Sequence, residues 1–483
     1  MALSCASDIQ QSTSCQFSVK DIRQERDPMK MFGKLALAMV SAFALLQFIR
    51  PDIPSGPATA EMQAPPQVRH ILEKSCYSCH SDQRRLSWFD EVAPAYWLVR
   101  RDILTARAQL DFSTLGSKPT VAQKATLFEA VNMIQLGAMP LPMFTALHPD
   151  ARVTPEELSL LRSYLAPWSS LPPSKNGSNE QPAAAPEQVP EPVNLAAVGT
   201  EFNGLAFEPG FENWKPISFT DRGDNNTFRF VLGNDIAVKA ARSGNISPWP
   251  DGSRFAKIAW QQELWSDGLI HPGKFLQVEF MVKSAHLYRK TDGWGWGRWR
   301  GMDLKPYGKD AGFVGECTSC HRPMRGDDSV YTLPITPVKM NREEVVNNRA
   351  SALAQGMSYQ PLEWSAITLY VAPGAHTMAA LLGNDVAMRA LRARGAASRE
   401  PQTYPPGAVL ALVTWAQRDD PHWFGARIPD APRSIEFVQV NAQGTASTYQ
   451  RFEGSRLVEP THSTESAARR RSFILNLAPA RMP

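Results

Sequence analysis

The sequence predicts a multidomain α+β protein, with one helical domain followed by two domains that each combine an antiparallel sheet with helices. Three observations support this fold class: helical periodicity in the first third, short alternating stretches after it, and an internal repeat within the strand-rich part. The chain has 483 residues, too many for one hydrophobic core. A net charge of +4 and the lack of a basic stripe argue against nucleic-acid binding.

Residues 1–60 form an N-terminal extension with an export signal. Lys30 and Lys34 precede the uncharged run 35–49, the layout of a basic region followed by an apolar one. The run is shorter than the roughly 20 residues of a comfortable membrane-spanning helix. Either the signal is cleaved, near 58–60, and a soluble periplasmic protein is released, or residues 35–49 remain as a tether to the inner membrane. A buried core helix is a third reading.

The helical domain is expected over 65–168. Apolar residues recur at helical spacing in 94–110, where the stripe consists of Ala95, Leu98, Val99, Ile103 and Leu104, and in 121–136. Thr154 is placed to cap a last helix. Residues 169–200, rich in proline, serine and alanine at their start, are expected to form a linker.

The segment 201–340 changes to short alternating stretches that predict an antiparallel sheet with one buried face. One helix is expected to begin at Asn234-Asp235 and to end at Gly244. The predicted strands cover 216–220, 227–232, 254–260 and 275–282.

An internal repeat identifies 341–483 as a second copy of the strand-rich domain. Leu232-Gly233-Asn234-Asp235 recurs 150 positions later as Leu382-Gly383-Asn384-Asp385, with matching residues on both sides. The second copy contains no cysteine.

Residues that differ between the copies are candidates for a function that only the first copy has. Asp221, Arg222 and Arg229 correspond to Val371, Ala372 and Ala379, and Lys257 corresponds to Leu412. Either these polar residues contact a cofactor in the first copy, or exposed positions have drifted.

The pattern Cys-x-x-Cys-His occurs twice, as Cys76/Cys79/His80 and as Cys317/Cys320/His321. Two thiols at this spacing can reach the two vinyl groups of one haem, and the adjoining histidine can then bind the iron. One such pentad arises by chance in about one of several hundred chains of this composition. The sequence therefore predicts two covalently attached c-type haems. A shared four-cysteine zinc site and disulfides are alternatives, but both leave the histidines unexplained.

The sixth ligand of the first haem is expected to be Met139, in Gly-Ala-Met-Pro, because a thioether raises the potential of a haem used for electron transfer. His148 competes with it, and an open site is the third alternative. For the second haem His271 and His286 are available, although surface positions suit both. The Gly-Trp rich stretch 293–299 either walls this haem or forms a core strand.

Two family resemblances rest on these motifs. Residues 65–168, with Cys76–His80 and Leu147-His148-Pro149, resemble the bacterial haem-binding domain family of small exported c-type modules. Residues 205–335, with Trp249-Pro250-Asp251-Gly252 and Cys317–His321, resemble the cytochrome P-460 family, and 360–457 resembles a haem-free remnant of it.

The second resemblance implies a sheet packed with helices around a c-type haem, a lysine cross-linked to the porphyrin, and oxidation of hydroxylamine or binding of nitric oxide. Lys257 matches that lysine and Arg229 the distal arginine. The family's distal carboxylate has no evident counterpart in the stretch 293–299.

The sequence thus predicts a dihaem electron-transfer protein whose second haem binds or oxidises a small nitrogen compound. The alternatives are an oxidoreductase acting on hydroxylamine, nitric oxide or peroxide at an open iron, and a gas sensor without turnover. A redox partner protein or a small electron carrier would exchange electrons with it.

Overall fold

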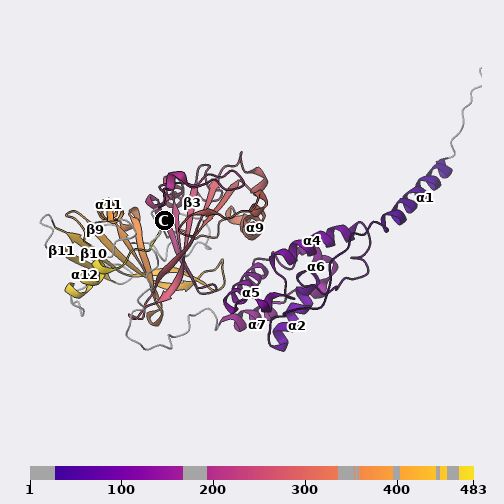
Figure 1. Ribbon diagram of the computed structural model, residues 1–483, viewed down its shortest axis with the longest axis horizontal. Helices are drawn as coiled ribbons and strands as arrows, with labels where there is room; N and C mark the ends of the chain where they lie inside the picture. The colour runs from indigo at the N-terminus through magenta and orange to yellow at the C-terminus, as the bar shows by residue number, and fades with distance from the viewer. Residues whose placement is uncertain are drawn as a thin grey trace, which may run out of the picture.

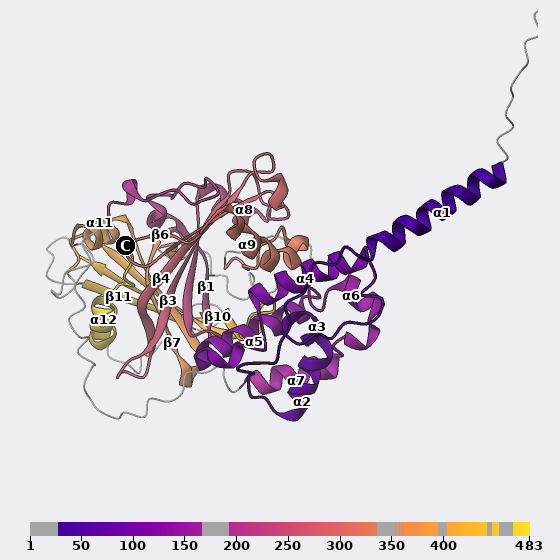
Figure 2. The ribbon, with the colours of Figure 1, turned by 45° about the vertical axis from the view of Figure 1, so that its right-hand side comes forward.

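A computed structural model describes residues 28–166, 193–335, 353, 357, 359–394, 403–441, 447–453 and 467–483. The linker expected after residue 168 falls largely outside the described residues. The described chain forms a helical domain and a strand-rich body that lie against each other, with helix α1 (Pro28–Leu46) extending away from both (Figures 1 and 2). Among the described helices, α1 included, none combines the length and apolar character needed to cross a membrane.

The helical domain confirms the predicted helices. Its core is formed mainly by α2, α5 and α7, and the cap of α7 is a complete capping box in which Thr154 and Glu157 bond each other's backbone N–H groups. Leu98, expected in the apolar stripe of α4, is instead 51% exposed, and Tyr96 takes the buried position with its hydroxyl donating to the Pro51 carbonyl at 2.6 Å. The helices are α2 (Pro66–Ser75), α3 (Tyr77–His80), α4 (Ala95–Gln109), α5 (Thr120–Gln135), α6 (Pro142–Leu147) and α7 (Pro155–Leu165).

The first strand-rich copy follows the predicted order, with strands longer than their sequence signals. Helix α8 begins after the Asn234 cap and ends at Gly244, whose φ of 76° suits glycine. Its elements are β1 (Lys215–Arg222), β2 (Thr227–Gly233), α8 (Asp235–Ser243), β3 (Arg254–Leu264), β4 (Ile270–Lys283), β5 (Trp294–Arg300), β6 (Lys305–Pro306) and α9 (Val314–His321).

The second copy repeats this arrangement down to its pairing register. Lys215 pairs with Gly233 in the first copy and Ser365 with Gly383 in the second, and the irregularity after Pro216 recurs after Ala366. Its elements are β7 (Ser365–Ala372), β8 (Thr377–Gly383), α11 (Asp385–Arg394), β9 (Val409–Asp419), β10 (Ala426–Val440), β11 (Ser447–Glu453) and α12 (Ala467–Asn476).

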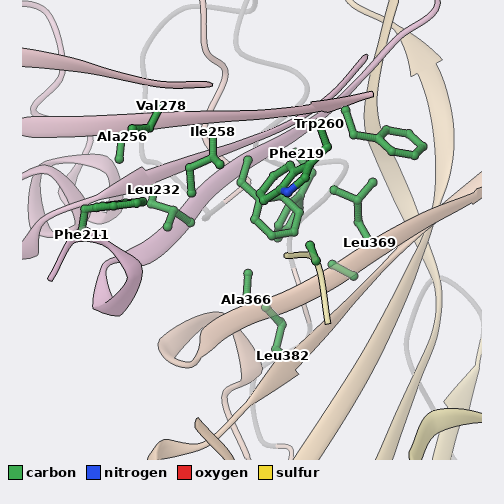
Figure 3. Packing of buried hydrophobic residues seen from close by; sticks show 14 of the residues in the cluster. Phe211, Phe219, Leu232, Ala256, Ile258, Trp260, Val278, Ala366, Leu369 and Leu382 are labelled. Carbon is green, nitrogen blue, oxygen red and sulfur yellow. The ribbon is translucent and has the colours of Figure 1, made fainter. Parts of the chain in front are cut away.

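The two copies are joined in one 11-stranded sheet of the described chain. Strand β1 pairs with β10, β4 pairs with β7, and β3 pairs with β4, so that β3, β2, β1, β10, β9, β8, β7 and β4 form a closed ring. Phe219 of the first copy contacts Trp415 of the second inside this ring, with ring centroids 6.0 Å apart. Figure 3 shows the shared core, in which residues of β1–β4 face Ala366, Leu369 and Leu382. The two copies therefore share one core inside the ring, and each also has a smaller apolar cluster of its own.

Candidate functional site

The first Cys-x-x-Cys-His motif lies where α2 gives way to the short helix α3. Both cysteines are free, and Cys76 packs against the helical core, where burial raises the pKa of its thiol to about 12. The His80 Nδ1 atom lies 2.9 Å from the Leu110 carbonyl oxygen. Since a backbone carbonyl at Nδ1 orients the ring and leaves Nε2 available, His80 is set up as a metal ligand. Burial lowers its pKa, which favours the neutral form that binds iron.

His148, the competing sixth ligand of the first haem, binds other residues of the helical domain. Its Nε2 atom lies 3.0 Å from Asp90 Oδ2 and its Nδ1 atom 3.1 Å from the Phe144 carbonyl, and its ring stacks on Phe144 at 4.0 Å. Both ring nitrogens of the competing ligand thus have partners. Met139 is half-buried in the turn after α5, where its N–H donates to the Met133 carbonyl at 3.1 Å. Its role as an iron ligand stays a prediction.

The second motif opens onto a cavity of about 410 Å³ on the outer face of the first-copy sheet. Because strand residues alternate between two faces, Phe219, Phe230 and Ile258 fill the ring while their neighbours line the cavity. Helix α9 lies over this face and contributes Cys317 and Cys320, both free. The strand residues that line the cavity are Ser218, Thr220, Arg222, Arg229, Val231, Phe255, Lys257, Gln277, Glu279, Phe280, Met281, Trp296, Gly297, Arg298 and Ile428.

His321 is held in the same way as His80. Its Nδ1 atom lies 2.8 Å from the Ser329 carbonyl, and its ring lies between Trp296 at 4.5 Å and Tyr331 at 5.2 Å. Burial lowers the pKa of His321 to about 4, so the ring is neutral at physiological pH. It is the one histidine among the lining residues within the described chain.

The other second-haem candidates lie elsewhere. His271 has its Nε2 atom 2.9 Å from Asp267 Oδ2 and stacks on Trp265, and His286 is exposed; neither lines the cavity. Of the tryptophans in 293–299, Trp296 lines the cavity, whereas Trp294 and Trp299 are fully buried in the hydrophobic cores. Trp294 and Trp299 therefore follow the alternative of a core strand, and the role of Trp296 as a haem wall stays a prediction.

A charged row crosses the cavity wall on three neighbouring strands. Lys257 on β3 is the cross-strand partner of Glu279 on β4, and Glu279 is the partner of Arg298 on β5. Glu279 forms ion pairs with both, at 2.8 Å from its Oε1 to the Arg298 Nε. Burial alone would raise the pKa of Glu279, but the two cations hold it far below its ordinary value. Burial lowers the pKa of Lys257, against the opposing effect of Glu279.

Glu279 is the residue that sequence reasoning missed. The stretch 293–299 contains no carboxylate, but the cavity lining includes several from other segments, Glu279 among them. The alternation of Gln277, Glu279 and Met281 along β4 was a usable signal, because it places the carboxylate on the same face as Lys257.

The residues singled out by comparing the copies divide between the two faces of the sheet. Arg229 and Arg222 line the cavity, so they are not exposed positions that have drifted, and their contact with a cofactor stays a prediction. The buried Nε of Arg229 has no hydrogen-bond partner, and burial together with Arg222 lowers the pKa of Arg229 to about 10. Arg222 is paired with the buried Asp224. Asp221 instead accepts from Gln262 at 2.6 Å and Gln417 at 2.8 Å, and does not line the cavity.

The corresponding face of the second copy is filled by apolar side chains. Leu381, Leu410 and Leu412 pack there with Ile474 of α12. Glu436 is the cross-strand partner of Leu412. Its carboxylate forms an ion pair with Arg470 of α12 at 2.6 Å. Helix α12 thus contributes Ile474 and Arg470 to the face of the second copy that corresponds to the cavity wall of the first.

Two further parts of the chain complete the cavity. Ala125 and Glu129 come from α5 of the helical domain, and Asp420 and Trp423 come from the loop between β9 and β10 of the second copy. No sequence signal connects these residues with the motif, since they belong to other structural units.

Comparison with protein families agrees with both resemblances. Residues 41–167 match the model of the haem-binding domain, and residues 208–332 match the model of cytochrome P460. The chain carries a haem-binding domain followed by a cytochrome P460 domain. No curated protein matches the chain. Haem is thus the cofactor, and the protein is a haem cytochrome.

The residues present fit haem in both domains. Each motif has two free thiols beside a histidine whose Nδ1 is already bonded, which leaves Nε2 for iron. In the cytochrome P460 domain the indole N–H of Trp296 and the Nε of Arg229 are buried without partners, as expected for groups that complete a bound cofactor or its ligand. The zinc alternative has no support, since the described residues contain no cluster of three or more potential metal ligands.

Proposed function

We propose that the protein is an exported dihaem c-type cytochrome that transfers electrons and whose second haem binds or oxidises a small nitrogen compound. The observation that carries this proposal is the cavity beside Cys317, Cys320 and His321, lined by Lys257 and Arg229 and closed on one side by the haem-binding domain.

The first haem is assigned to electron transfer. Cys76 and Cys79 would form its thioether bonds, His80 would be one axial ligand and Met139 the other. Cys76 contributes to the helical core, and the apolar surroundings of its thiol suit a haem that changes charge without binding substrate. Haem here supplies one-electron chemistry, and the protein's part is to hold its ligands.

The second site is suited to a small polar ligand. Cys317 and Cys320 would attach the haem and His321 would bind its iron. Arg229, with its unpartnered Nε, can donate a hydrogen bond to an oxygen or nitrogen atom of a bound molecule. Glu279 is ionised and its ion pairs hold Lys257 and Arg298 beside the cavity, while the haem-binding domain offers an exit for the electrons that hydroxylamine releases on oxidation.

Two alternatives share this geometry. The second site could be an oxidoreductase acting on hydroxylamine, nitric oxide or peroxide at an open iron, or a gas sensor without turnover. The absence of a second histidine from the lining residues of the described chain favours an open iron, although Met281 also lines the cavity.

The proposed location is the periplasm. Residues 35–49 either belong to a cleaved signal or tether the protein to the inner membrane, and a redox partner protein or small electron carrier would exchange electrons with the haem-binding domain. Detection of the mature N-terminus by mass spectrometry distinguishes cleavage from retention.

The test is the visible spectrum of the reduced protein beside its Lys257→Ala variant. A red-shifted band that disappears in Lys257→Ala, and persists in the exposed-lysine control Lys239→Ala, would establish the covalent bond between Lys257 and the porphyrin. Two ordinary ferrous c-haem spectra, unchanged by Lys257→Ala, would refute that bond. Spectral change on adding nitric oxide separates an open second iron from a six-coordinate electron carrier, and turnover with an artificial electron acceptor separates enzyme from sensor.

A further inference from the structure

The loop between β9 and β10, Asp420–Gly425, leaves the second strand-rich copy and enters the helical domain. Phe424 packs against the helical core. Its ring stacks on Phe128 of α5 with centroids 5.2 Å apart, and the guanidinium of Arg162 on α7 lies 4.9 Å from its centroid. A side chain of one domain thus packs into the core of another.

The backbone of the loop is bound as closely as its side chain. Asn132 of α5, fully buried, accepts a hydrogen bond from the Phe424 N–H at 2.6 Å and donates one to the Phe424 carbonyl at 3.0 Å. Gly425 has a φ of 88°, and a Cβ there would lie 2.7 Å from the Phe128 ring. Only glycine allows this approach without displacing Phe128.

The preceding residues of the same loop bind the cytochrome P460 domain. The indole N–H of Trp423 donates to Asp224 at 3.1 Å, and Arg222 lies 4.4 Å above its ring. His422 has its Nδ1 atom 2.8 Å from the Tyr331 carbonyl. Tyr331 in turn contacts both Trp423, at 5.5 Å, and His321, at 5.2 Å.

The hydrogen bond between Lys124 and Asn226, which joins the helical domain directly to the first copy, is weaker than the contacts made by the loop. Lys124 Nζ lies 3.4 Å from Asn226 Oδ1, a long hydrogen bond. The loop of the second copy instead supplies a stacked ring, a cation–π contact and two backbone hydrogen bonds to the helical domain. Ala125 and Glu129, which line the cavity, belong to α5, the same helix whose Phe128 and Asn132 bind this loop.

We propose that the haem-free copy acts as a clamp, whose loop Asp420–Gly425 fastens the haem-binding domain over the cytochrome P460 cavity. This assigns a role to the copy that has lost haem attachment. The clamp makes α5 one wall of the cavity and connects the helical core to His321 through Phe424, Trp423 and Tyr331. It requires no particular chemistry at the second haem.

The test compares two phenylalanines of the same copy in the full-length, haem-loaded protein. Phe424→Ala removes the clamp, whereas the control Phe473→Ala alters a half-buried ring that lies under Arg470 at 4.8 Å on the copy's own helix α12. Hydrogen exchange of α5 amides, followed by mass spectrometry, should accelerate about tenfold in Phe424→Ala and remain unchanged in Phe473→Ala. Small-angle X-ray scattering should show a larger maximum dimension in Phe424→Ala alone.

Equal α5 exchange and equal dimensions in the two variants would overturn the clamp. If Phe424→Ala does not accumulate, Arg162→Gln at an exposed helix position provides the same test and should accelerate α5 exchange by a smaller factor. Both readouts are independent of ligand binding or turnover, so a failure of the proposed function would leave them interpretable.

Discussion

Replacing Glu279 by glutamine should destabilise the cytochrome P460 domain far more than the loss of one surface ion pair would. The side chains of Glu279, Lys257 and Arg298 are 15%, 29% and 20% exposed, so the two cations would lose their counter-charge in a largely buried row. Breaking a buried pair from one side costs about 3–5 kcal/mol. Partial exposure and the remaining amide hydrogen bond place the expected loss near the lower limit, about 3 kcal/mol. For a folding unit of about 150–250 residues, a loss of about 3 kcal/mol lowers the Tm by about 6–12 °C.

The assay is urea unfolding of the haem-loaded protein, followed by haem absorbance and by tryptophan fluorescence. Glu436→Gln is the matched variant, because Glu436 is the equivalent carboxylate of the second copy, is 1% exposed and is bound by Arg470. Both variants should lose stability, but only Glu279→Gln should also change the absorbance of the second haem. A loss below about 1 kcal/mol in Glu279→Gln, the range of surface pairs, would refute the reasoning.

The pH dependence of this effect follows from the depressed pKa of Glu279. A carboxylate whose pKa is lower when folded contributes stability above its unfolded value, about 4.3, and loses it as the pH falls toward the folded value. The difference between the wild type and Glu279→Gln should therefore be full at pH 7 and shrink below about pH 4.3. A difference that grows on acidification would contradict the assigned ionisation.

Two further predictions concern the haem-binding domain. Met139→Ala should lower the potential of the first haem by on the order of 0.1 V in a potentiometric titration, because a thioether ligand raises the potential; an unchanged potential would leave His148 or an open site as the alternatives. Thr154→Ala removes the capping box of α7 and should cost about 1 kcal/mol in urea unfolding, whereas Thr154→Ser should retain most of the stability, and equal losses in both would show that the cap contributes little.

Local sequence signals predicted the elements because each depends on a few neighbouring residues. The Asn234 cap and Gly244 stop define α8, and strand alternation located β1–β4. The prediction that Leu98 is buried was wrong, because periodicity identifies an apolar stripe on a helix without showing which of its residues a neighbouring segment covers. Tyr96 is the buried residue instead, and its hydroxyl donates to the Pro51 carbonyl.

The sequence by itself determined the two Cys-x-x-Cys-His motifs, the repeat and the presence of Lys257 and Arg229 on one strand-rich domain, since each is carried by residue type and spacing. Tertiary structure alone decided that Glu279 lies between Lys257 and Arg298, because strand register brings them together. It also decided that the two copies close one ring and that Phe424 enters the helical core. These are contacts between residues far apart in the chain, and their free energy depends on packing that no local pattern encodes.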